Sequence, residues 1–401
     1  MKILRIIARL NVGGPARHVV WLTSALQDDE FQSKLIAGKV PQGEEDMAYI
    51  ADAAGVSPIF IEEMSRELSL KDFVSLFKIY SQIRRQRPDI IHTHTAKAGT
   101  VGRIAALLYR WTTFRKLKVV HTFHGHVFHS YYGKGKTRLF LLIEKFLARF
   151  VTDKIITISP QQFHEIHEEF GIGRREQFEI VPLGIDLEPF ADSDGKREKF
   201  RNEIGVASDE VLVGFVGRLT EIKNIPMLLQ GVAKYAETSY ADNPKLTFII
   251  VGDGHMRQTL EKEAASLKVN NLVTFLGNRI DTNVVYAALD IIALTSLNEG
   301  TPLSLIEAMA SERPVISTLV GGVRDLLGEI GESSDGFNIH ERGLSVESGE
   351  AGALAKGLIY LAENEKLRLR LARAGKIYVE LNYSKDRLIS DIKSLYRNLL
   401  K

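Results

Sequence analysis

The chain has 401 residues, enough for two domains of ordinary size. Its 45% hydrophobic and 25% charged residues are typical of a globular protein, and its formal net charge is only +2. There is no cysteine, which excludes disulfides, thiolate metal sites and cysteine nucleophiles and favours a cytosolic protein. No apolar stretch is long enough to span a membrane, and the apolar run after Met1 is too short for a signal peptide.

Short β-rich segments alternate with helical patterns through both halves of the chain. Helices are predicted at Pro15–Gln27 and Asp72–Arg87, then at Met227–Thr238, Met256–Leu267 and Leu305–Ala310. This alternation is typical of parallel sheets with right-handed crossovers. The predicted strands are Ile3–Leu10, Lys34–Val40, Ser57–Ile61, Ile90–His94, Lys118–Phe123, Lys154–Ser159, Glu179–Leu183, Val211–Val216, Leu246–Val251, Leu272–Leu276, Ile291–Thr295 and Pro314–Thr318.

The polar stretch Asp186–Lys196 is the predicted linker between the halves. We therefore expect an α/β protein with two doubly wound, Rossmann-like domains, at residues 1–185 and 197–380. Ligands of such sheets bind beyond the carboxyl ends of the strands, so the two domains would face each other across a ligand cleft. The last helix, at residues 381–401, has one apolar face, and we expect it to pack back on the N-terminal domain.

Two glutamates, Glu299 and Glu307, mark the segment SLNEGTPLSLIEAMA at Ser296–Ala310. Pro302 and the apolar residues after it predict a helix that starts near Thr301, because Pro is favoured at the first helical position and Thr is a good cap. Glu299 would then lie on the loop before the helix, and Glu307 about a turn and a half inside it.

The amides of Leu303 and Ser304 would point out of this helix N-terminus, where unpaired N–H groups and the helix dipole attract anions. One carboxylate on the loop, a second on the helix and free amides between them suit a ligand that carries hydroxyls beside a phosphate. A sugar nucleotide is such a ligand. The alternative is a capped helix with two surface acids.

Two of the predicted strands are followed by turns that could bind a phosphate, one through glycine and the other through basic side chains. The Gly-Gly-Pro turn at Gly14 opens the first helix and could bring backbone close to a phosphate, but it is not the dinucleotide fingerprint. Arg218 and Lys223 follow the strand Val211–Val216 and could grip a diphosphate, since Arg offers a planar fork and Lys a point charge. Purely structural roles are the alternative for both turns.

Histidines cluster at the ends of two predicted strands of the first half. Paired histidines suggest a metal site, but no carboxylate lies near them in the sequence. Hydrogen bonding to a polyhydroxylated ligand is the favoured interpretation, and a metal site is the alternative. Six of the 11 histidines form this group, namely His92, His94, His121, His124, His126 and His129.

Basic residues are concentrated between Arg84 and Arg149, with 14 Lys or Arg against two acids. Two segments, Leu107–Lys118 and Tyr131–Phe150, combine these bases with large apolar side chains. They predict reversible, salt-sensitive binding to an anionic membrane, although part of the apolar bulk must be core. A nucleic-acid binder is disfavoured, since no RNA or DNA module is recognisable.

Together these features resemble the GT-B glycosyltransferases of retaining family 4, and in particular bacterial enzymes of exopolysaccharide, capsule or O-antigen synthesis. The motifs that carry the resemblance are NVGGPARHV, HTHTAKAGTVGRIAA, VVHTFHGH, IITISPQQ, IVPLGID, VGRL-x₃-K, VGDG, E-x₇-E, PVIST and GGV. The chain departs from the pattern at Arg324, Asp325 and a small insertion at Gly328–Arg342, which leaves the donor's identity open.

The resemblance implies a role for each site residue. Glu299 would contact the hydroxyls of the donor sugar, and His124 would face the reacting carbon. Glu307 would hold the ribose. The diphosphate and base would be held by Gly14, Arg218, Lys223, Arg279, Gly300, Thr301, Leu303 and Ser304.

The implied reaction is transfer with retention from a nucleoside diphosphate sugar, UDP-linked rather than GDP-linked, to a lipid-linked saccharide. No metal or other cofactor is expected, because the leaving diphosphate would deprotonate the acceptor and its charge would be stabilised by cations. The enzyme would lie on the cytoplasmic face of the membrane. The alternatives are a sugar-nucleotide epimerase or hydrolase of the same architecture and a glycosyltransferase with a small soluble acceptor.

Overall fold

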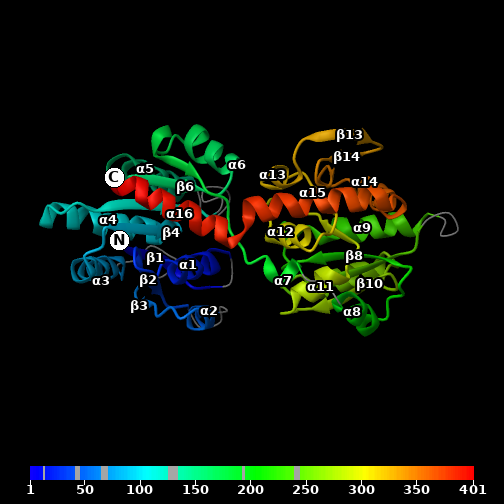
Figure 1. Cartoon of the computed structure of the whole chain (residues 1–401). Coiled ribbons are helices and arrows are strands. Elements are labelled where there is room, and N and C mark those ends of the chain that lie inside the picture. Colours follow the sequence, from blue (N-terminus) through cyan, green and yellow to red (C-terminus); the bar gives the residue numbers. More distant parts are fainter. Residues whose placement is uncertain (12–13, 41–45, 65–70, 125–133, 192–194, 239–243) are drawn as a thin grey trace. The chain divides into compact units, whose positions relative to one another are not determined.

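The computed structural model describes residues 1–11, 14–40, 46–64, 71–124, 134–191, 195–238 and 244–401 (Figure 1). The chain divides into two compact units. Unit 1 contains Met1–Ile185 together with Lys385–Lys401, and unit 2 contains Asp186–Ser384. None of the described helices is long and apolar enough to cross a membrane.

Unit 1 is built on a seven-stranded sheet of order β3-β2-β1-β4-β5-β6-β7, in which every neighbouring pair is parallel. The order runs outward in both directions from β1 and β4, so the topological switch point of the doubly wound fold lies between them. The strands are β1 (Lys2–Arg9), β2 (Gln32–Gly38), β3 (Ile59–Ile61), β4 (Ile90–His94), β5 (Lys118–Thr122), β6 (Lys154–Thr157) and β7 (Phe178–Ile180).

Helices cover both faces of this sheet because successive strand residues point to opposite sides. On one face, Leu4 of β1 packs in a core with α3 (Lys71–Gln86), α4 (Ala96–Thr113) and α5 (Lys134–Phe150). On the other, Ile3 packs with α1 (Gly14–Ala25) and α16 (Lys385–Leu400). The shorter helices are α2 (Ala48–Ala53) and α6 (Pro160–Phe163).

Unit 2 has an eight-stranded sheet of order β10-β9-β8-β11-β12-β15-β14-β13. The parallel part contains β8 (Val211–Val216), β9 (Leu246–Val251), β10 (Val273–Gly277), β11 (Ile291–Leu294), β12 (Val315–Thr318) and β15 (Leu344–Val346). The segment described as an insertion forms β13 (Ile330–Ser334) and β14 (Phe337–His340), which extend the sheet as an antiparallel edge.

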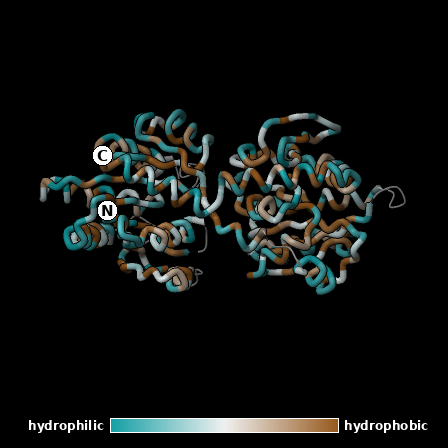
Figure 2. Tube along the Cα trace, viewed as in Figure 1, coloured by the Kyte–Doolittle hydropathy of each residue, from teal (hydrophilic) through white to brown (hydrophobic). Residues whose placement is uncertain are grey.

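In unit 2, helices α9 to α13 lie between these strands in the chain, α7 and α8 precede them, and α14 and α15 follow them. In both units, hydrophobic residues gather along the strands and the inner sides of the helices (Figure 2). The predicted last helix begins at Lys385, because Ser384 is extended and separates it from the preceding helix. The helices are α7 (Glu188–Ala191), α8 (Lys196–Ile204), α9 (Ile225–Ala236), α10 (Arg257–Ser266), α11 (Thr282–Ala288), α12 (Leu303–Ala310), α13 (Val323–Leu327), α14 (Ala351–Glu363) and α15 (Glu365–Tyr383).

Candidate active site

Glu299 lies on the loop between β11 and α12, and its carboxylate is held by two side chains. Lys223 Nζ lies 2.5 Å from Oε1, and the hydroxyl of Ser296 donates to the same oxygen over 2.5 Å. The Glu299 side chain is 10% exposed and that of Lys223 is 21% exposed. The two residues predicted to bind different parts of a ligand therefore form one ion pair at the carboxyl edge of the unit 2 sheet.

Two glycines fix the backbone of this loop. A Cβ on Gly321 would lie 1.7 Å from the carbonyl oxygen of Glu299, and one on Gly322 would lie 1.9 Å from that of Gly300. The Gly322 N–H also donates to the Gly300 oxygen over 2.9 Å. The GGV motif thus holds Glu299 in place through close backbone contact, a role that nothing in the sequence pattern indicates.

Helix α12 starts two residues later than predicted, at Leu303. Pro302 takes an extended ψ of 107° and occupies the cap position, with no side-chain cap, so Thr301 does not cap the helix. The amides of Leu305 and Ile306 both donate to the Pro302 carbonyl. The amides of Leu303 and Ser304 consequently come before the first hydrogen bonds within the helix, as an anion site at this end requires.

Glu307 faces the neighbouring helix α11 from inside α12. Burial, and then the adjacent Glu307 carboxylate, raise the pKa of the Tyr286 hydroxyl well above its usual value. Tyr286 is fully buried, whereas Glu307 is only partly so. Glu307 is therefore positioned by a packed aromatic residue, and its role toward a ribose stays a prediction.

Arg218 follows β8 on a loop that touches the turn after β9. A Cβ on Gly252 would lie 1.9 Å from the Gly217 oxygen, so the two loops meet at backbone distance. The Arg218 side chain is exposed and has no ion-pair partner among the described residues. Unlike Lys223, it is available to an anion without breaking a contact.

Arg279 follows β10, where the nucleotide base was expected. Its guanidinium pairs with Asp281 over 2.7 Å and with Glu203 over 2.5 Å, and these carboxylates raise its pKa. It also lies 5.1 Å from the centre of the Phe200 ring. The side chain is thus engaged within unit 2, and a contact with the donor stays a prediction.

Unit 1 gathers a histidine cluster, which consists of His18, His94 and His124. His94 Nδ1 lies 2.9 Å from His124 Nε2, and the His18 ring centre lies 4.8 Å from that of His124. His18 comes from α1, which begins at Gly14, and was not identified from the sequence because it sits among apolar residues of a helix. The expected positions His126 and His129 lie outside the described residues.

His92 belongs to a second layer beneath this cluster. Arg5 donates to the Tyr396 hydroxyl over 3.0 Å, and that hydroxyl lies 2.6 Å from His92 Nδ1. Arg5 Nη1 also lies 3.1 Å from His92 Nδ1, and because arginine can only donate, Nδ1 is an acceptor. The Tyr396 hydroxyl therefore donates to Nδ1, and the His92 proton lies on Nε2. Nε2 then donates to Thr122 Oγ1 over 2.7 Å.

The geometry and the charge of the histidine cluster bear on the alternative of a metal site. The three residues can place ligand atoms within 4.8 Å of one another, as a bound ion would require. Burial lowers the pKa of His18 and His94 well below the usual range and that of His124 to about 4, so all three are neutral at pH 7. The buried Arg5 cation contributes to this shift for the first two, and the same field opposes a metal ion.

Comparison with known proteins identifies the family. Residues 196–378 match the model described as glycosyl transferases group 1, and residues 12–189 match the model of glycosyltransferase family 4. The chain belongs to the GT4 glycosyltransferases. It is an enzyme with the α/β GT-B fold, as the motifs predicted.

Two curated relatives and one solved structure illustrate the likeness. The chain is 28% identical to the UDP-Gal:alpha-D-GlcNAc-diphosphoundecaprenol alpha-1,3-galactosyltransferase of Escherichia coli, over 88% of this chain and 86% of that one. It is 27% identical to the capsular polysaccharide biosynthesis glycosyltransferase CapM of Staphylococcus aureus, over 90% and 88%. Anabaena Alr3699/HepE, solved in complex with UDP, superposes with a TM-score of 0.80 at 22% identity, over 99% and 100%.

Proposed function

We propose that this enzyme transfers a sugar, with retention, from a UDP-linked donor to a lipid-linked saccharide during synthesis of a bacterial surface polysaccharide. The observation that carries the proposal is the ion pair of Lys223 and Glu299 beside the free amides of α12. A cation and amides suit the diphosphate, and the carboxylate suits the sugar hydroxyls. The names of the E. coli and S. aureus relatives support the lipid-linked acceptor and the polysaccharide product.

The chemistry would use charge stabilisation and no metal. As the bond to the sugar breaks, negative charge develops on the leaving diphosphate, where Arg218, Lys223 and the amides of Leu303 and Ser304 can stabilise it. The diphosphate would take the acceptor's proton. Glu299 would hold the sugar hydroxyls, and His124, kept neutral by burial, would donate to or accept from a hydroxyl near the reacting carbon.

We also propose that unit 1 brings the enzyme to the cytoplasmic face of the membrane. Helix α5 has two faces: Phe140 and Leu147 are buried in the core, whereas a second stripe is exposed. Apolar and basic side chains spaced three and four residues apart lie in an interface when they share an exposed helix face. The exposed stripe consists of Arg138, Leu139, Leu142, Lys145, Phe146, Arg149 and Phe150.

Slow donor hydrolysis with a panel of UDP- and GDP-sugars tests the donor. The product's anomeric configuration, followed by NMR in the first minutes, tests retention. We expect one UDP-sugar to be consumed, with its configuration kept, and consumption to survive EDTA. Release of the free 2-epimer would favour the epimerase alternative, and consumption of no sugar nucleotide would refute the proposal.

A further inference from the structure

A groove of about 690 Å³ opens at the amino edge of the unit 1 sheet. Lys118 begins β5 at this groove, and His124 follows the other end of the same strand. The groove is therefore separated from the histidine cluster by the length of the strand, roughly 17 Å for five residues. It is lined by Asp89, Arg110, Phe114, Arg115, Lys116, Leu117, Lys118, Asp153, Leu399, Leu400 and Lys401.

The groove carries an excess of positive charge. Asp153 pairs with Arg110 over 2.5 Å and lies 3.7 Å from Lys118, so its carboxylate is already neutralised. Arg115 and Lys116 are exposed, and neither has a side-chain partner within the described ranges. These two cations are available to an anionic ligand.

Phe114, at the rim of the groove, is placed in an unfavourable conformation and left in solvent. It ends α4 with φ of +52°, in the left-handed region, and it is 93% exposed. Helix ends of this kind normally use glycine, and a bulky residue costs roughly 1–2 kcal/mol there. Trp111, one turn earlier, is 74% exposed. Core packing accounts for neither of these exposed aromatic residues, and backbone preference disfavours Phe114 at its position.

We propose that this groove binds the phosphate of an anionic phospholipid headgroup, while Trp111 and Phe114 enter the interfacial layer of the bilayer. Aromatic rings beside cations are the side chains that anchor proteins at membrane interfaces. The inference rests on the proposed membrane association and names its lipid contact. A second hollow of about 630 Å³ shares Lys118, Leu399 and Lys401 and continues the groove under α16.

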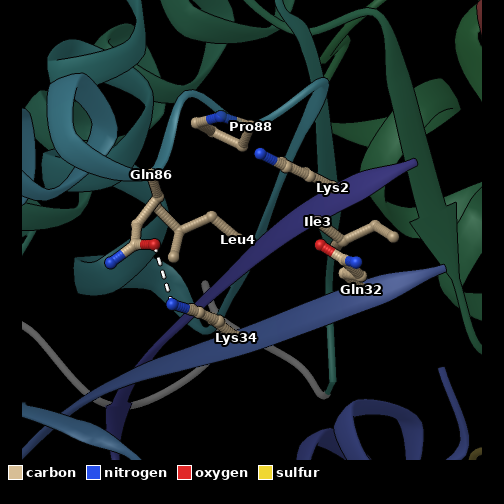
Figure 3. Close-up of a pocket in the computed structure, with 7 residues that line it drawn as sticks. All are labelled: Lys2, Ile3, Leu4, Gln32, Lys34, Gln86 and Pro88. Atoms are coloured by element: carbon tan, nitrogen blue, oxygen red, sulfur yellow. Dashed lines mark hydrogen bonds between the residues drawn. The ribbon is translucent and has the colours of Figure 1, made fainter. Parts of the chain in front are cut away.

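Another hollow at the same edge shows why the assignment is specific. The cavity lined by Lys2, Ile3, Leu4, Gln32, Lys34, Gln86 and Pro88 has a volume of only about 100 Å³ (Figure 3). There the Lys34 ammonium donates to Gln86 Oε1 over 2.9 Å, as the dashed line in Figure 3 marks. That site is too small for a headgroup, and Lys34, one of its two lysines, already has a partner.

Flotation with phosphatidylglycerol or phosphatidylcholine vesicles tests the proposal on the full chain. We expect Arg115→Gln with Lys116→Gln to weaken binding to phosphatidylglycerol by roughly tenfold or more, since each cation contributes to attraction by an anionic leaflet. The matched control, Lys366→Gln with Arg370→Gln on α15 of unit 2, removes the same charge from exposed positions and should bind as the unsubstituted protein does.

Phe114→Gly separates a membrane role from a structural one. Glycine fits φ of +52° without strain, so this variant should unfold at a higher temperature while binding vesicles more weakly. Three outcomes would each overturn the inference. Phe114→Gly could float as well as the unsubstituted protein, or the Arg115 and Lys116 variant could bind vesicles as tightly as its control. The unsubstituted protein could also bind neutral and anionic vesicles equally. Donor hydrolysis without vesicles should be unchanged in every variant, so its absence in the unsubstituted protein would instead reject the proposed function.

Discussion

Replacing Glu299 by glutamine should leave nucleoside diphosphate binding intact or strengthen it, although transfer fails. Lys223 Nζ lies 2.5 Å from the Glu299 carboxylate, so a diphosphate must compete with that carboxylate for the lysine. Glutamine keeps the shape of the side chain and can still accept from Ser296, but it removes the charge that holds Lys223. The substitution therefore releases a cation toward the diphosphate.

The size of the effect follows from the burial of the pair. Exposed ion pairs contribute up to about 1 kcal/mol, and charge-assisted hydrogen bonds about 1.5–3 kcal/mol. With side chains 10% and 21% exposed, the pair falls between these cases. We expect Glu299→Gln to bind UDP up to roughly tenfold more tightly, which corresponds to about 1.4 kcal/mol. Transfer should fall by about 100-fold or more if the carboxylate binds the sugar in the transition state.

Titration calorimetry with UDP measures this directly. Glu307→Ala should weaken UDP binding, because its proposed partner is the ribose, and Lys223→Met should weaken it through loss of the cation. Glu299→Gln combined with Lys223→Met should bind no more tightly than Lys223→Met alone, since no lysine remains to be released. If Glu299→Gln loses as much UDP affinity as Glu307→Ala, this division of roles between the two glutamates is wrong.

Four further outcomes can be checked. Arg218→Ala and Lys223→Ala should each reduce turnover severely with an unchanged circular dichroism spectrum, and a near-normal rate in either would remove our diphosphate assignment. Activity should survive EDTA, whereas loss that zinc restores would assign the histidine cluster to a metal. Gly322→Ala places a Cβ 1.9 Å from the Gly300 oxygen, so its melting temperature and its activity should both fall, and a normal rate would contradict the proposed backbone contact. Acid should destabilise unit 1: the pKa of His124 is lowered from 6.5 to about 4, so its contribution to stability is complete above pH 6.5 and is lost as the pH falls toward 4, which chemical denaturation at several pH values measures.

Apart from β15, the parallel strands of both units could be predicted because buried β-rich runs alternate with amphipathic helices. The strands β13 and β14 could not. All five residues of β13 are exposed, and the segment Ile330–Ser334 contains one large apolar residue, so neither alternation nor a hydrophobic run marks it. It is a strand because β14 offers it an antiparallel edge. The start of α12 was misplaced because Pro302 was assigned to the helix, whereas its extended backbone puts it just outside.

The loop that carries Glu299 was predictable because its residues are contiguous in the sequence. Its rigidity was not, since Gly321 and Gly322 reach the loop from another strand end and act through backbone contact. Lys223 was predicted as a diphosphate ligand, but a spacing of 76 residues gives no sign that it pairs with Glu299. Local motifs therefore indicate the kinds of side chain at a site, whereas their partners depend on how the strands assemble.

The layer beneath the histidine cluster is the clearest case of this dependence. Arg5 lies in a strand that is otherwise largely apolar, and its partner Tyr396 is 391 residues away on α16. Arg5 is fully buried and pairs with no carboxylate in the described part of the chain, so its positive charge acts on the histidines above it. That charge favours neutral imidazoles, which bind hydroxyls, and opposes both a second proton and a metal ion. On the proposed function, the cations of unit 2 would serve the diphosphate, whereas in unit 1 burial and the charge of Arg5 keep imidazoles neutral, which suits an uncharged sugar.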